Sequence, residues 1–121
     1  MKFRQLIDKV QLRSGFSDEE SMDALECMVE SLAVHLDESD RKYFAEELPV
    51  ELQDIALSVY PTEKTASQDF LEQFMEQQHI KKTRAIRQIL SSWGALKEAI
   101  SAGQIAHIRA QLPVKALLLL R

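Results

Sequence analysis

Apolar residues recur along most of this chain at intervals of three and four positions, the spacing that places side chains on one face of an α-helix. The clearest case is the segment 18–36, in which one stripe contains Met22, Leu25, Val29, Leu32 and Leu36. No stretch shows the period-two alternation that is typical of a strand, and runs of β-branched residues are few. The pattern therefore predicts an all-α fold in which this stripe faces the core.

The same pattern occurs twice in the chain. With a shift of 64 positions, residues 4–57 align without a gap on residues 68–121, and the Leu-Pro-Val segments 48–50 and 112–114 coincide. Periodicity alone is weak evidence, because any two amphipathic helices share these spacings, but a common register over several elements indicates a duplication. The stripe of the first copy falls on a second one, which consists of Ile86, Ile89, Trp93, Leu96 and Ile100.

We therefore expect a compact helical bundle of two pseudo-symmetric four-helix repeats. The repeats cover about 3–58 and 67–121, with a connector at about 59–66, and together they form a single helical domain over residues 1–121. The connector contains Pro61 and a cluster of polar residues, and it is too short to separate two independent domains.

The helices within each repeat follow from local start and stop signals. Ser17 with Glu20, and Thr65 with Gln68, have the spacing of a capping box, in which side chains bind the first free amides of a helix. Each Leu-Pro predicts a corner, because proline suits a first helical turn and restricts the residue before it. The expected helices are 3–13, 18–36, 39–47 and one after Pro49, then 66–77, 82–100, 103–111 and one after Pro113.

Three short segments resemble motifs of a known family. They are "DFLEQF" at 69–74, "AEELP" at 45–49 and, less closely, "RAQLP" at 109–113, where Arg109 replaces an alanine. With these segments the chain resembles a prokaryotic family of uncharacterised helical proteins, catalogued as domain of unknown function 2267. The resemblance implies an all-α bacterial or archaeal protein, and it implies no activity, cofactor or catalytic residue.

Composition agrees with a helical protein and indicates its compartment. The chain has 121 residues, of which 45% are hydrophobic and 28% charged, and its one cysteine cannot form an internal disulfide. The N-terminal segment lacks the apolar stretch of a secretory signal, and the longest apolar run, 116–120, is far shorter than a membrane span. We expect a cytoplasmic protein.

Charge separates the two repeats. Residues 1–60 contain 6 Lys/Arg and 14 Asp/Glu, whereas residues 61–121 contain 9 and 5, so the balances are −8 and +4. The basic cluster lies near the start of a predicted helix, where an anion or an acidic partner could bind. We therefore take as candidate contact residues Lys81, Lys82, Arg84 and Arg87. The overall pI is near 5.4, and aromatic residues do not interleave with the basic ones. Both features argue against nucleic-acid binding.

No pattern predicts a catalytic or metal site. The three histidines, His35, His79 and His107, lack the spacing of a helical zinc or di-iron site. The three glycines form no phosphate-binding loop. We therefore predict no cofactor, no metal and no enzymatic activity.

Two further features of the second predicted helix receive a structural interpretation. Asp23, Glu26 and Glu30 form a carboxylate stripe on its polar side, which we expect to face water. Cys27 lies next to the apolar stripe and is expected to be a core or boundary residue rather than a nucleophile.

The C-terminus leaves oligomeric state open. Val114 and the leucines at 117–120 present more apolar surface than one face of a short helix hides. The segment is either wedged between the repeats or covered by a second subunit, so monomer and homodimer both stay open.

The function expected from the sequence is a non-enzymatic protein–protein interaction or structural module with an unidentified partner or self-association. The alternative is anion or nucleic-acid binding through the basic cluster at 81–87.

Overall fold

The computed structural model describes residues 1–62 and 69–120, and within them every regular element is an α-helix. The all-α prediction is confirmed. The helices are α1 (Phe3–Ser14), α2 (Asp18–Ala33), α3 (Glu38–Glu46), α4 (Val50–Leu57), α6 (Phe70–Gln78), α7 (Lys82–Ala99), α8 (Ala102–Ala110) and α9 (Val114–Leu119).

One of the two predicted capping signals marks the start of a helix in the described residues. Ser17 caps α2, and its hydroxyl accepts a hydrogen bond from the amide of Glu20 at 3.1 Å. The reciprocal bond of a capping box is absent, because the Glu20 carboxylate binds Arg84 and Gln88 instead. The expected box of Thr65 and Gln68 lies outside the described residues, and α6 begins later than predicted, after the cap Asp69.

Both Leu-Pro segments form the expected corners. The prolines Pro49 and Pro113 are the caps of α4 and α9, with extended backbone angles. The leucines before them, Leu48 and Leu112, are buried. These segments therefore turn the chain while each leucine anchors the corner in the core.

The predicted apolar stripes lie in the core. Eight of their ten members are buried, and only Met22 and Ile86 are half-buried. One hydrophobic cluster contains residues from both halves of the chain, among them Leu25 and Phe44 from the first and Phe74 and Trp93 from the second. The two halves therefore share a core.

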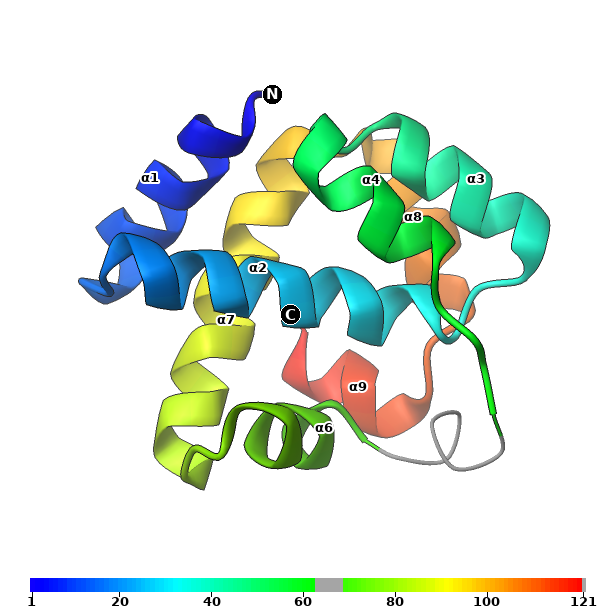
Figure 1. Ribbon diagram of the computed structural model, residues 1–121. Coiled ribbons are helices and arrows are strands. Elements are labelled where there is room, and N and C mark those ends of the chain that lie inside the picture. Colours follow the sequence, from blue (N-terminus) through cyan, green and yellow to red (C-terminus); the bar gives the residue numbers. More distant parts are fainter. Residues whose placement is uncertain (63–68, 121) are drawn as a thin grey trace.

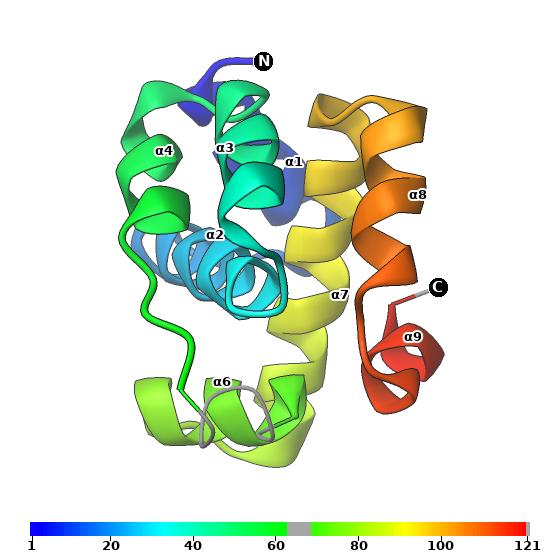
Figure 2. The same cartoon turned by 90° about the vertical axis from the view of Figure 1, so that its right-hand side faces the viewer.

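The helices cross in layers around α7. Figure 1 shows α2 crossing α7 and α1 lying beside the upper part of α7, with α3 and α4 above α2 and α6 and α9 below it. In Figure 2, α2, α3 and α4 lie on one side of α7, and α8 and α9 lie on the other. Helices α2, α3 and α4 begin 64 residues before α7, α8 and α9, the offset of the sequence repeat. A symmetry relation in space, and the division of one domain into two repeats, stay predictions.

The C-terminal helix is packed on one side only. Ala116 and Leu120 are buried, whereas Val114 and Leu118 are 72% and 63% exposed. The segment is thus partly wedged against the core, and part of its apolar surface stays open. None of the helices in the described part of the chain is both long and apolar enough to span a membrane.

Candidate functional site

The basic cluster predicted from the sequence lies at the start of α7, but its members have different surroundings. Lys81 caps the helix and Lys82 begins it, and both side chains are exposed. Neither lysine has an ion-pair partner among the residues that the structure describes. These two ammonium groups are therefore available to solvent.

The two arginines of the cluster are held by the fold. Arg84 Nε donates to Glu20 Oε2 at 2.7 Å, and a second guanidinium nitrogen contacts Glu20 Oε1. Arg87 Nη2 donates to the backbone oxygen of Ser14 at 2.7 Å. Both guanidinium groups lie over the ring of Phe16, at 4.6 and 5.2 Å from its centroid. The four cations thus do not form one free basic surface.

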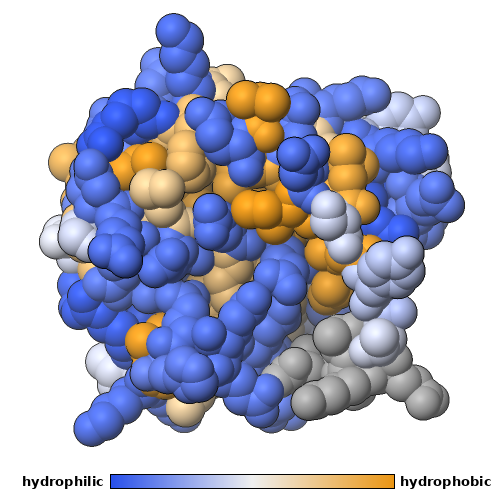
Figure 3. Space-filling model, in the orientation of Figure 1, coloured by the Kyte–Doolittle hydropathy of each residue, from blue (hydrophilic) through white to orange (hydrophobic). Residues whose placement is uncertain are grey.

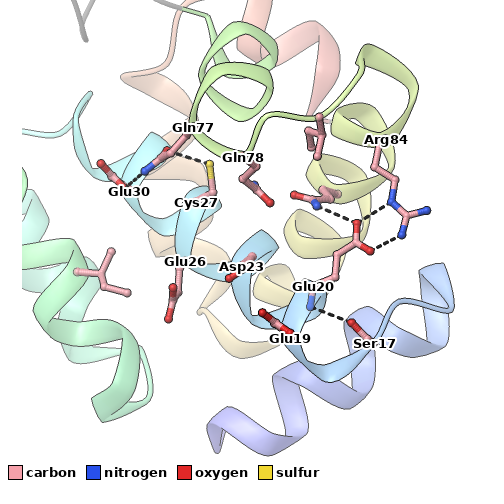
Figure 4. A pocket seen from close by; sticks show the side chains of 13 residues that line it. Ser17, Glu19, Glu20, Asp23, Glu26, Cys27, Glu30, Gln77, Gln78 and Arg84 are labelled. Carbon is pink, nitrogen blue, oxygen red and sulfur yellow. Dashed lines mark hydrogen bonds and ion pairs between the residues drawn. The ribbon is translucent and has the colours of Figure 1, made fainter.

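A larger feature lies beside Arg84, a cavity of about 710 Å³ along the outer side of α2. Helix α2 provides its floor, the end of α6 and the start of α7 form one wall, and Ile55 of α4 contributes to the other (Figure 4). Five carboxylates line it, at a spacing that follows one stripe of α2. They are Glu19, Glu20, Asp23, Glu26 and Glu30.

These carboxylates are only partly compensated. The hydrogen bonds from Arg84 hold the pKa of Glu20 below its usual range. Partial burial, reinforced by the charges of Glu19 and Glu20, raises the pKa of Asp23. Partial burial and the charge of Asp23 likewise raise the pKa of Glu26. Over the described residues, Glu19, Asp23 and Glu26 have no cationic partner, so the cavity carries excess negative charge.

The expectation that Asp23, Glu26 and Glu30 face water fits Asp23, which is exposed, but fits Glu26 and Glu30 only in part. These side chains line a cavity, and Glu26 and Glu30 are half-buried because α4 and α6 flank α2. Glu30 accepts a hydrogen bond from Gln77 Nε2 of α6 at 2.8 Å. The sequence shows the stripe, but it does not show which helices lie on either side.

Two amides of the cavity have unsatisfied atoms. Gln88 is only 1% exposed, and its Nε2 donates to Glu20 Oε2 at 2.9 Å, while its Oε1 has no partner. Gln78 Nε2 is also buried without a partner. Buried polar atoms are normally paired, so these two amides lack hydrogen bonds that most buried amides make.

Cys27 closes the floor of the cavity as a structural residue. Its thiol is buried and lies 3.2 Å from Gln77 Oε1. Burial raises the pKa of the Cys27 thiol to about 12, so it is protonated at neutral pH and a poor nucleophile. The prediction of a core or boundary cysteine is confirmed.

A second hollow continues the first toward the end of α2. It measures about 290 Å³ and shares Glu30 and Ile55 with the larger cavity. Its other lining residues are mainly apolar and come from α2 and the segment after α4: Val34, Ser58, Val59 and Tyr60. We call the two hollows together the α2 groove. In Figure 3, which shows this face, apolar side chains gather over α4 and the segment that follows it.

The carboxylates give the groove an excess of negative charge along its length. Its carboxylates follow the length of α2, and no group of three His, Cys, Asp or Glu within the described residues converges on one point. An extended cationic surface fits this arrangement better than a single ion.

The fold and the groove together define an all-helical protein with an acidic groove along its second helix. The model of the family described as "Uncharacterized conserved protein (DUF2267)" matches residues 3–119, and the chain belongs to this family. The resemblance recognised in the sequence is confirmed. No curated protein and no solved structure matches the chain at a significant level.

Proposed function

We propose that this protein is a non-enzymatic protein-interaction module that binds a positively charged segment of another protein in the α2 groove. One observation carries the proposal: the exposed Asp23 and the half-buried Glu26 line a cavity beside further carboxylates and have no cationic partner in the described chain. Charge repulsion of this kind is relieved when a cationic partner binds, and a partly desolvated site strengthens the attraction.

The shape of the groove also favours a peptide segment. Helix α2 has 16 residues, which corresponds to a length of about 24 Å. Carboxylates line one end of the groove, and Val34, Ile55 and Val59 line the other. A segment with basic residues at one end and apolar residues at the other matches both parts, since apolar anchors add affinity that salt does not screen.

Anion or nucleic-acid binding through the basic cluster has weaker support. Arg84 and Arg87 already have partners within the fold, and the carboxylates around Arg84 would repel phosphate. Lys81 and Lys82 are the remaining cations of the cluster. As part of the proposal we keep the bacterial origin and cytoplasmic location expected from the sequence.

The proposal is tested by fluorescence anisotropy with a labelled peptide of alternating lysine and leucine. We expect Asp23→Asn together with Glu26→Gln to weaken binding on the order of tenfold, because two uncompensated charges are lost. The matched control is Glu46→Gln together with Glu51→Gln, which removes the same charge from exposed positions outside the groove. The control should bind within about twofold of wild type.

A second titration, with labelled duplex DNA, tests the alternative. Lys81→Glu together with Lys82→Glu is the informative variant, because neither side chain has an ion pair to lose. If wild type binds DNA with a steep salt dependence and this variant does not, the protein is a nucleic-acid binder and the proposal is wrong.

A further inference from the structure

The groove already holds one guanidinium group from its own chain. Arg84 directs its donors to the two oxygens of Glu20 and stacks on Phe16. This paired geometry is the one that guanidinium and carboxylate groups prefer, and an ammonium group cannot reproduce it. Glu20, at the end of the groove next to α7, is thus already paired with a guanidinium group of the same chain.

Further acceptors in the same cavity stay unused. Arg84 is neutralised by Glu20, so the charges of Asp23 and Glu26 are not compensated by it. Gln88 holds Glu20 through its Nε2, which leaves its Oε1 as a buried acceptor without a partner. Asp23, Glu26 and Gln88 thus line one cavity, in which the two carboxylates have no cationic partner among the described residues and the buried amide oxygen has no donor.

Donor number and hydration distinguish the two cationic side chains that could supply these bonds. A guanidinium group has five N–H donors in one plane and is weakly hydrated, whereas an ammonium group is strongly hydrated and has three. A guanidinium can therefore face two carboxylates and still direct an N–H toward the amide oxygen. An ammonium group attracts the carboxylates but gains less from leaving water.

We infer that the cavity beside Arg84 is an arginine subsite, in which a guanidinium group of the partner binds between Asp23, Glu26 and the free amide oxygen of Gln88. The inference rests on the proposed function and adds the chemical identity of the recognised side chain. Gln88 is a specificity residue in this account, and the two carboxylates supply most of the attraction. Gln88 Oε1 is itself buried, so the Gln88 side chain has to turn toward the cavity before a donor of the partner reaches this atom.

The test compares labelled hexa-arginine and hexa-lysine by anisotropy at one salt concentration, with hexa-glutamate as the negative probe. We expect wild type to prefer hexa-arginine on the order of tenfold, and Gln88→Met to reduce the preference below about twofold. Binding of hexa-lysine to Gln88→Met should change little. If Gln88→Met does not fold, Gln88→Asn withdraws the amide by one methylene and serves the same purpose.

Gln73→Met is the matched control. Gln73 is also buried with an unpartnered Oε1, but it lies on α6 and does not line the groove, so the arginine preference should persist. Equal binding of the two cationic peptides to wild type would overturn the arginine subsite and leave the proposed function standing. A preference that survives both Gln88 variants would also overturn it. If neither cationic peptide binds more tightly than hexa-glutamate, the proposed function fails as well.

Discussion

Single residues show where the fold accommodates unfavourable charge or crowding. Gly94, inside α7, is an example: a Cβ at this position would lie 2.5 Å from Nε of Arg13. The Arg13 side chain crosses α7 there and forms an ion pair with Glu98 at 3.2 Å. The glycine thus leaves room for the Arg13 side chain to lie across α7, at a cost in helix propensity.

At Asp23 and Glu26 the cost to the fold lies in charge rather than in helix propensity, because each carboxylate lies near other carboxylates. A carboxyl whose pKa is raised on folding holds its proton more tightly in the folded protein, so stability is lost as pH rises through the raised pKa. We expect Asp23→Asn and Glu26→Gln each to raise the free energy of unfolding near neutral pH by roughly a few tenths of a kcal/mol.

This gain has a defined pH dependence. It should disappear when pH falls below the ordinary carboxyl values of 3.8 and 4.5, where both states are protonated. Urea denaturation at several pH values measures it. Glu20→Gln is the control and should be less stable than wild type, because Arg84 loses its partner. A loss of stability in Asp23→Asn at neutral pH would show that the charge is compensated.

At the scale of elements, contacts between distant segments determine what each helix exposes. The pair of Glu20 and Arg84 connects α2 to α7 at positions 64 residues apart, which are equivalent in the sequence repeat. Opposite charges at equivalent positions thus bind each other. This pair places one acid in the first half of the chain and one base in the second.

Helix α9 gives a prediction at this scale. Leu120 follows α9 and is fully buried, whereas Leu118 is 63% exposed. We expect Leu120→Ala to cost roughly 2 kcal/mol or more, since it leaves a cavity, and Leu118→Ala to change stability by less than about 0.5 kcal/mol. Thermal unfolding measures both.

The Leu118→Ala variant also tests whether α9 forms a subunit interface. Light scattering gives the molar mass of wild type and of Leu118→Ala. A dimeric wild type that becomes monomeric in this variant would show that a second copy covers the exposed face of α9.

The whole molecule depends on one shared core. The hydrophobic cluster contains side chains from α1, α2, α3 and α4 as well as α6, α7, α8 and α9. Trp93, the one tryptophan of the chain, lies within this cluster and is 1% exposed. If one repeat unfolded by itself, the apolar side chains of the other repeat that pack against it would become exposed to water.

We therefore expect one cooperative unfolding transition. The midpoints from tryptophan fluorescence and from far-ultraviolet circular dichroism should coincide in urea, as they do for small two-state domains. Two separate transitions would instead indicate that the repeats fold independently and that the chain consists of two domains.

The sequence by itself determined the local features of this protein. Apolar spacing predicted the buried stripes through Leu25 and Trp93, and the prolines at 49 and 113 predicted the corners before α4 and α9. These predictions succeed because helix periodicity, capping and the restrictions of proline act between residues close together in the chain.

Only the tertiary structure decided which polar residues form a site. The stripe of Asp23, Glu26 and Glu30 is visible in the sequence, but it became a groove because α4 and α6 flank α2. Likewise, the basic cluster divided into two free lysines and two engaged arginines once Glu20 and Ser14 lay beside α7. Burial and pairing depend on neighbours that are distant in sequence, and no local pattern contains that information.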